Sequence, residues 1–237
     1  MKRVILAFFL LIIASTAFAQ SIVTSDSLVI ATFSTPKVRV ALQGGLGYII
    51  GAVDKTMGQD MIEYQKKLKK GLNDGADISY FYSAGNSIGL KYSHVRSSVS
   101  AYGTFSFDDG TTQSGELSDN ISLLFIGPYL GMSTLGNGSK HIFSLNAGAG
   151  YVGYKDDACV ITPYTVSGWT LGYYIGLQYD FMITKTIALG AEAALFTGTI
   201  TDLNKTENGT TSKLQLEKGQ AQGASHLDLT LGLRFYL

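Results

Sequence analysis

The sequence has little charge, one cysteine and three prolines. Asp, Glu, Lys and Arg together make up 15% of the 237 residues, against about 25% in soluble globular domains. Lys+Arg and Asp+Glu both number 18, so the basic excess of a nucleic-acid-binding domain is missing. A single cysteine excludes an intramolecular disulfide and any zinc or iron–sulfur site built from several cysteines. Glycine, in contrast, is frequent, at 28 residues.

The first 19 residues have the three parts of a secretory signal peptide. Lys2 and Arg3 form its positive start, residues 4–13 its apolar stretch, and Ala17-Phe18-Ala19 a small-residue cleavage site. A retained membrane anchor is the alternative, but the apolar run is 16 residues long, shorter than the about 20 that span a bilayer. We therefore expect residues 1–19 to be cleaved and residues 20–37 to form a periplasmic tail.

The rest of the chain alternates between apolar and small or polar residues with period two, which is typical of strands with two different faces. The terminal segment 227–237 shows this most clearly, with Leu or Phe at every second position. Pro128 falls within the fourth segment, whose register stays open because both of its faces are apolar. The pattern predicts eight strands, at residues 38–52, 76–82, 87–96, 120–133, 141–154, 168–181, 187–197 and 226–237.

The predicted connections alternate between long and short. Successive connections in an antiparallel sheet lie at opposite ends, so all the long ones share one end. Transmembrane barrels have this asymmetry, with short periplasmic turns and longer extracellular loops. After the signal peptide no run of 18 apolar residues remains, so no membrane helix is expected. The long connections are residues 53–75, 97–119, 155–167 and 198–225, and the short ones are residues 83–86, 134–140 and 182–186.

The composition of the two faces favours a barrel in lipid. The face rich in glycine and polar residues suits a narrow lumen, while the face of whole Leu, Ile, Val and aromatic side chains suits hydrocarbon. A soluble lipocalin-like barrel is the alternative, with the large side chains inside. We predict an all-β fold, an eight-stranded antiparallel up-and-down transmembrane β-barrel over residues 38–237. Two aromatic belts are expected, Tyr80, Tyr82, Tyr179, Phe181, Phe235 and Tyr236 near the short turns, and Tyr48, Tyr151, Tyr154 and Trp169 near the long loops.

Charged residues on the predicted inner face nearly balance in sign. The lumen of an eight-stranded barrel is just wide enough for side chains, and buried charges must be paired. We predict a salt-bridge network in which Arg39 and Arg234, on the first and last strands, contact Glu192 or Asp228. The alternative is a narrow ion pathway. The inner charges are Arg39, Asp77, Lys91, Asp180, Glu192, Asp228 and Arg234.

The long connection 53–75 carries a candidate helix. Apolar residues at Met57, Met61, Tyr64 and Leu68 have the spacing of one helical face, and Gly71 is placed to cap its end. The lysines of its last turns would bind lipopolysaccharide phosphates or an acidic partner, or would simply face solvent. These lysines are Lys66, Lys67, Lys69 and Lys70.

No catalytic, cofactor or metal site is predicted. His94 and His226 lie beside Ser93 and Ser225 near the outer rim, but no acidic partner completes a triad. Three scattered histidines make no metal site. Cys159 is expected in the third long loop, as a free thiol.

The signal peptide, the loop from Tyr64 to Gly71 leading into a strand, Ile126-Gly127-Pro128 and the alternating strand Leu227–Leu237 resemble the eight-stranded outer-membrane barrels of Gram-negative bacteria, the OmpA/OmpX-like group. More narrowly, the chain is similar to the porin-like "outer membrane protein beta-barrel" family of Bacteroidetes. The resemblance implies the cell outer membrane, with its lipid and lipopolysaccharide and the barrel assembly machinery as partners. It implies that this machinery reads the terminal strand at Leu233, Phe235 and Leu237, where most members end in Phe.

We expect no enzymatic activity and no cofactor. We expect a structural or adhesion-like role, with the long loops 53–75 and 198–225 binding a protein partner or a surface ligand but no nucleic acid. A small-solute porin and a lipid A-modifying enzyme are the alternatives.

Overall fold

A computed structural model describes most of the chain. Residues 1–19, the predicted signal peptide, and most of the predicted tail 20–37 lie outside the part that is described. None of the helices in that part is long and apolar enough to cross a membrane. The described residues are 36–51, 58–106, 112–135, 139–214 and 221–237.

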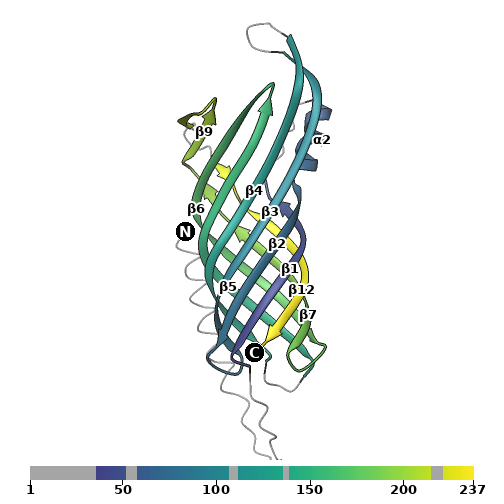
Figure 1. Cartoon of the computed structure of the whole chain (residues 1–237), viewed down its shortest axis with the longest axis vertical. Helices are drawn as coiled ribbons and strands as arrows, with labels where there is room; N and C mark the ends of the chain where they lie inside the picture. The colour runs from purple at the N-terminus through teal and green to yellow at the C-terminus, as the bar shows by residue number, and fades with distance from the viewer. Residues whose placement is uncertain (1–35, 52–57, 107–111, 136–138, 215–220) are drawn as a thin grey trace, which may run out of the picture. The chain divides into compact units, whose positions relative to one another are not determined.

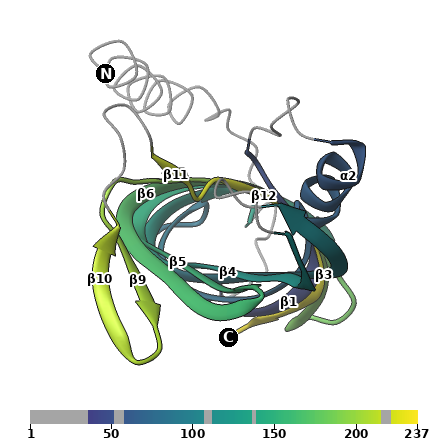
Figure 2. The same ribbon diagram turned by 90° about the horizontal axis from the view of Figure 1, so that it is seen from above.

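Eight strands form a closed antiparallel ring, and Figure 1 shows it from the side and Figure 2 from above. Each strand from β1 to β7 pairs with the next along the chain, and β12 closes the ring by pairing with both β7 and β1. The predicted eight-stranded barrel is therefore confirmed. The strands are β1 (Val38–Ile49), β2 (Lys70–Phe81), β3 (Asn86–Ser106), β4 (Thr112–Ser133), β5 (His141–Val160), β6 (Thr162–Met182), β7 (Ile187–Thr197) and β12 (His226–Tyr236).

Short secondary-structure elements lie at the end of the barrel that carries the long connections. Helix α2 (Gln59–Leu68) leads into β2. The strands β9 (Leu203–Glu207) and β10 (Thr210–Leu214) form a hairpin that pairs with the outer part of β6. Two further strands, β8 (Thr199–Ile200) and β11 (Gln222–Gly223), pair with each other.

Several strands are longer than the sequence indicates. The predicted loops 97–119 and 155–167 are mostly strand, because β3, β4, β5 and β6 keep pairing well past their predicted ends, as in Ser97↔Ile121 and Asp156↔Val166. Strand β2 likewise begins at Lys70 rather than at residue 76. These outer segments lack the strong apolar alternation of the membrane part, but the ladder hydrogen bonds set there continue outward. Cys159 is consequently in β5, opposite Ser118 and Pro163, and not in a loop.

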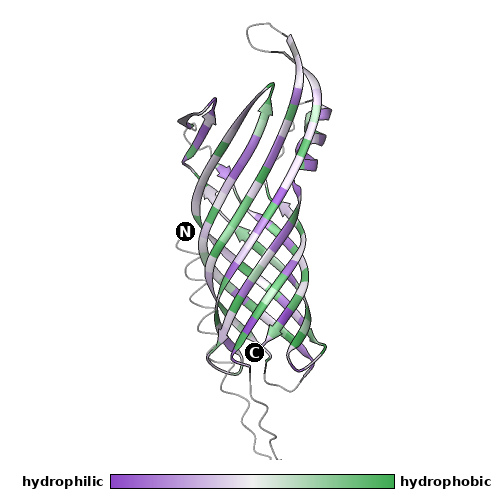
Figure 3. Cartoon of the chain, in the orientation of Figure 1, coloured by the Kyte–Doolittle hydropathy of each residue, from purple (hydrophilic) through white to green (hydrophobic). Residues whose placement is uncertain are grey.

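The outer wall of the ring is apolar. Large side chains that would be buried in a soluble protein are exposed here, with Leu171 at 76% and Leu231 at 66% of their surface. Figure 3 shows these green positions alternating with polar ones along each strand. An apolar band of this kind is what lipid contacts in a transmembrane barrel, and it contradicts the soluble alternative. Two predicted belt aromatics are an exception, since Tyr154 and Tyr236 point inward and are 8% and 1% exposed.

The described part of the lumen is filled in layers. Phe81 and Tyr236 stack near the short turns. Charged side chains occupy the middle. Above them Phe125 on β4 packs against Phe196 on β7, with ring centroids 4.9 Å apart. These layers position the groups described next.

Candidate functional site

All seven predicted inner charges are buried in the lumen. Arg39 Nη2 lies 2.6 Å from Asp77 Oδ1, and its Nη1 lies 3.7 Å from Asp180 Oδ2. Lys91 on β3 reaches Glu192 on β7 with an Nζ–Oε2 distance of 2.5 Å. Strands β3 and β7 are on opposite sides of the ring, so this ion pair crosses the whole lumen.

The predicted partners of the two arginines are wrong. Arg39 and Arg234 both approach Asp180, at 3.7 and 3.4 Å, and neither forms an ion pair with Glu192 or Asp228. The tilt and stagger of the strands set which inner residues meet across a barrel. Neither the tilt nor the stagger can be predicted from the spacing of residues along the sequence.

Neutral polar side chains complete the network and were missed by the sequence reasoning. Tyr174 donates its hydroxyl hydrogen to Glu192 Oε1 at 2.6 Å, and Gln43 donates to Glu192 Oε2 at the same distance. Tyr129 donates to Asp77 at 3.1 Å, and Gln178 accepts from Arg39 at 2.7 Å. For Gln43, Tyr174 and Gln178 the available signal was their position, because each alternates onto the same face as a predicted inner charge on its own strand. Tyr129 had no such signal, since the register of its segment stays open in the sequence.

Asp228 lies apart from the lysine and arginine ion pairs. Ser93 and Asn73 donate to its Oδ2, both at 2.8 Å, and His226 Nε2 lies 3.7 Å from the same atom. Three cations thus face four carboxylates, and the buried His226 is the titratable group beside the fourth.

The histidines and serines do not form a catalytic triad. Ser93, Asp228 and His226 converge, but the carboxylate lies between the other two, whereas a nucleophile must contact its base. Ser225 accepts from the Gly198 backbone N–H at 3.3 Å. His94 contacts Ser122 Oγ at 2.7 Å, on the outward-facing side of its strand. Within the described ranges no three His, Cys, Asp or Glu residues could hold a metal ion.

Glycines make room for the large inner side chains. A Cβ atom on Gly89 would overlap the Tyr129 ring and would lie 2.6 Å from the Ile78 carbonyl oxygen. Tyr129 is only 3% exposed and is held by Asp77 and Arg39. The lumen therefore has no space into which this ring can move.

We expect Gly89→Ala to destabilise the barrel by about 1–3 kcal/mol, the usual cost of overpacking a core. Urea unfolding of the refolded protein in detergent micelles measures the loss. Gly44→Ala is the matched control, since its Cβ would face outward with only the Asn73 carbonyl oxygen nearby, at 3.5 Å. Equal stability of the two variants would contradict a tightly filled lumen.

The lysine-rich helix is shorter than predicted. It spans Gln59–Leu68, and Lys69 rather than Gly71 is its C-cap. Gly71 instead pairs with Gly47 in the sheet, and Met57 lies outside the described residues. Lys66, Lys67 and Lys70 are exposed, while Lys69 donates to the Gly51 carbonyl oxygen.

The predicted assembly signal lies at the end of the last strand. Leu233 and Leu237 are 45% and 67% exposed on the outer wall, and Phe235 is partly buried on the same face.

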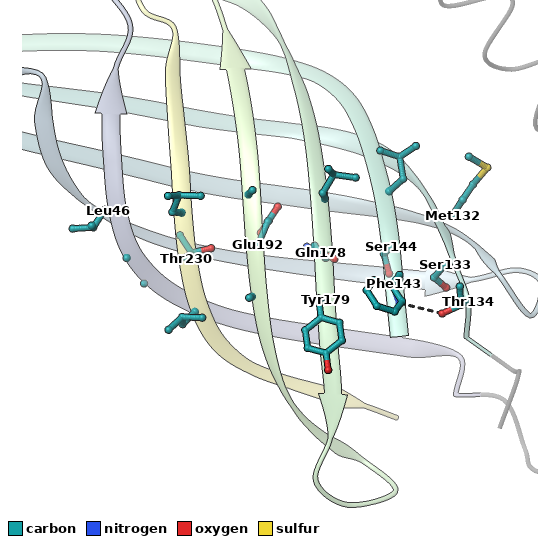
Figure 4. A pocket seen from close by; sticks show the side chains of 18 residues that line it. Leu46, Met132, Ser133, Thr134, Phe143, Ser144, Gln178, Tyr179, Glu192 and Thr230 are labelled. Carbon is teal, nitrogen blue, oxygen red and sulfur yellow. Dashed lines mark hydrogen bonds between the residues drawn. The ribbon is translucent and has the colours of Figure 1, made fainter. Parts of the chain in front are cut away.

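A groove of about 950 Å³ lies in the short-turn half of the wall (Figure 4). Small residues at Ala191 and Ala193 form its floor, between Leu177 and Leu229 on the flanking strands. Glu192 and Gln178 also border the groove, but their side chains belong to the lumen network.

No family model matches the chain, and no curated protein matches it. Solved structures do. The outer membrane protease OmpT from Escherichia coli is 10% identical over 89% of this chain and all of its own, with a TM-score of 0.50. Neisserial surface protein A (NspA) is 11% identical over 84% of this chain and 97% of its own, with a TM-score of 0.52. A major outer membrane protein from Thermus thermophilus is 12% identical over 84% of this chain and 98% of its own, also with a TM-score of 0.52.

At these identities the likeness shows the fold alone. Together with the apolar outer wall, the fold is that of a bacterial outer-membrane β-barrel, and the outer membrane is where such a wall is buried in lipid.

Proposed function

We propose that this outer-membrane barrel is a closed structural anchor that presents its extended outer sheet to binding partners. The observation that carries the proposal is the filled lumen. Lys91–Glu192 joins β3 to β7, Arg39–Gln178 joins β1 to β6, and Phe125–Phe196 joins β4 to β7. Each contact bridges strands that are not neighbours in the ring, so side chains cross the lumen at more than one level.

The outer sheet supplies the surface for partners. Strands β3, β4, β5 and β6 are 20 to 22 residues long, about twice the 9–11 residues that a membrane strand needs. Beyond Trp169 and Tyr151 the outward positions become polar, as at Lys155 and Ser167. The surplus length therefore projects into water, on the side that is extracellular in barrels of this type.

The end of helix α2 adds exposed lysines to this surface. Lys70 pairs with Tyr48 at the outer border of the apolar wall, and Lys66 and Lys67 are exposed in the turn before it. At this height the phosphates of lipopolysaccharide supply negative charge, so these lysines are proposed to contact them. The C-terminal segment Leu233–Leu237 is proposed to be read by the barrel assembly machinery, as in the OmpA/OmpX-like group and the porin-like barrels of Bacteroidetes.

The porin and enzyme alternatives find less support. A small-solute porin needs a water-filled path where this lumen holds ion pairs. A lipid A-modifying enzyme needs an accessible nucleophile, whereas Ser93 and His226 are 1% and 0% exposed.

We expect the purified protein to produce no conductance steps of nanosiemens size in planar bilayers. Flotation of the reconstituted protein with lipid vesicles on a density gradient is the control that it has inserted, so that an absence of current is informative. Regular nanosiemens steps from the unaltered protein would favour the porin and contradict the closed anchor.

A further inference from the structure

A second polar cluster lies on the inner face of the outer sheet, beyond the membrane. It consists of Asp119 on β4, Asp156 and Tyr154 on β5, Tyr164 on β6 and Tyr64 from helix α2. Asp119 and Asp156 share the inward face with Leu123 and Val152 further down the same strands, by the period-two alternation. The two aspartates lie diagonally across the β4–β5 ladder, in which Asp119 pairs with Ala158 and Ile121 with Asp156.

Tyrosine hydroxyls are the only donors that contact these carboxylates through side chains among the described residues. Tyr64 donates to Asp119 Oδ2 at 2.8 Å, and Tyr154 donates to Asp156 Oδ2 at 3.2 Å. Asp156 is only 9% exposed, and its second oxygen, Oδ1, is buried with no hydrogen-bond partner. A buried carboxylate oxygen without a partner is unfavourable, so a donor that entered the cluster would be stabilised by a hydrogen bond to this atom.

The two aspartates lack a countercharge among the residues that the structure describes. In the part of the chain that the structure describes, neither forms an ion pair. Lys205, on the neighbouring β9, is already paired with Glu207 at 2.8 Å. Burial and the nearby Asp119 carboxylate together raise the pKa of Asp156 from 3.8 to about 6, the response expected of an acid that lacks a cation.

The tyrosine rings suit a cation as well. The Lys205 ammonium group lies 4.6 Å from the centre of the Tyr164 ring, so an aromatic face of this cluster already holds an alkylammonium ion. Carboxylates that accept charge-assisted hydrogen bonds and aromatic rings that offer cation–π contact form a common receptor for such groups. A metal ion is less suited, because the cluster offers two carboxylates and no third His, Cys, Asp or Glu ligand within the described residues.

We propose that the cluster of Tyr64, Asp119, Tyr154, Asp156 and Tyr164 binds a basic side chain, a guanidinium or alkylammonium group, presented by a protein partner at the cell surface. The proposal rests on the anchor function above and names the chemistry of its partner. Charge-assisted hydrogen bonds from the bound group would reach Asp156 Oδ1 and Asp119, and the tyrosine rings would pack against its apolar stem.

The test is a titration of the full chain in detergent micelles, followed by NMR or tyrosine fluorescence. The probes are Nα-acetyl-arginine amide, the lysine counterpart, and the citrulline counterpart, which has nearly the shape of arginine without its charge. We expect saturable binding of the two charged probes and at least about tenfold weaker binding of citrulline, since hydrogen bonds to charged groups contribute most. Binding is expected to weaken below pH 6, where Asp156 becomes protonated.

Two variants locate the site. Asp156→Asn is expected to weaken arginine binding about tenfold or more, and it should fold because it removes an uncompensated buried charge. Asp157→Asn is the matched control, since Asp157 is the next residue, faces outward and pairs with Lys155. No saturable binding, equal binding of citrulline, or equal losses in the two variants would overturn the proposal. None of these results bears on the closed anchor, which the conductance experiment tests separately.

Probes that mimic other amines separate the sources of the charge. A basic peptide that binds more tightly than spermidine at equal charge supports a protein partner. The reverse order, with a free polyamine preferred, would contradict it.

Discussion

Replacing Lys91 with methionine is expected to lower the free energy of unfolding by about 3–5 kcal/mol, the cost of breaking a buried ion pair from one side. Lys91 is 1% exposed, and its Nζ lies 2.5 Å from Glu192 and 3.6 Å from Asp77. Methionine retains most of the volume, so the loss reports charge rather than a cavity. Removing the ammonium group leaves the buried Glu192 carboxylate without its cation, while Asp77 keeps its ion pair with Arg39.

Urea unfolding of the refolded protein in micelles or thin vesicles measures this loss. The control is Lys155→Met, because Lys155 pairs with Asp157 at 2.6 Å but its side chain is 56% exposed. Exposed pairs contribute little, so the control should change stability by less than about 1 kcal/mol. In the double variant Lys91→Met/Glu192→Gln, removal of the partner charge should restore part of the loss. A Lys91→Met protein as stable as the parent would show that the lumen admits enough water to solvate these charges.

Introducing arginine at Leu231 is expected to destabilise the barrel by about 2–4 kcal/mol, although Leu231 is exposed. Its side chain is 66% exposed at the middle of β12, opposite Ala191 and Gly44, which cannot shield a charge. If this position faced water, introducing a polar residue would hardly change the free energy of unfolding. The cost arises because the surrounding medium is hydrocarbon, so the variant tests directly what lies against the wall.

Ser98→Arg is the matched control for this variant. Ser98 is exposed on the outward face of β3, two residues beyond Arg96, where the wall is already polar. We expect a change below about 0.5 kcal/mol there. Both unfolding energies come from urea titrations in phosphatidylcholine vesicles. Equal effects at the two positions would mean that Leu231 does not face lipid.

How far the sequence predicts this molecule depends on whether a property is local. Alternation identified β7 to the residue, and it placed all seven charges on the inner face, because the side-chain period of a strand is fixed by its backbone. It also gave the antiparallel order, since the alternating lengths of the connections leave few topologies.

Contacts that depend on the stagger between strands could not be predicted from the sequence. Asp180 lies near both Arg39 and Arg234 because of the stagger between the strands. The spacing of residues along the sequence does not reveal this stagger. The cluster around Asp119 and Asp156 was missed for another reason. Residues 97–119 and 155–167 were interpreted as loops, and residues in a loop have no predictable face. Once β5 is seen to continue, the same alternation places Asp156 on the inner face. Asp119 needs the structure as well, because the sequence leaves the register of β4 open.

The seam between β1 and β12 has a consequence for how the barrel forms. Eleven residue pairs, from Arg39↔Tyr236 to Ile49↔His226, join the two ends of the barrel chain. Contacts between residues so far apart in sequence form slowly, because the chain loses the entropy of loop closure before the stabilising interactions between the two strands are made. Arg39 and Arg234 stand on either side of this seam and share Asp180, and the contact between Arg234 and Asp180 forms only when the last strand docks. We therefore expect closure of the barrel to be a late step. Until then the open sheet has two unpaired edge strands and an exposed apolar face, through which unclosed chains aggregate.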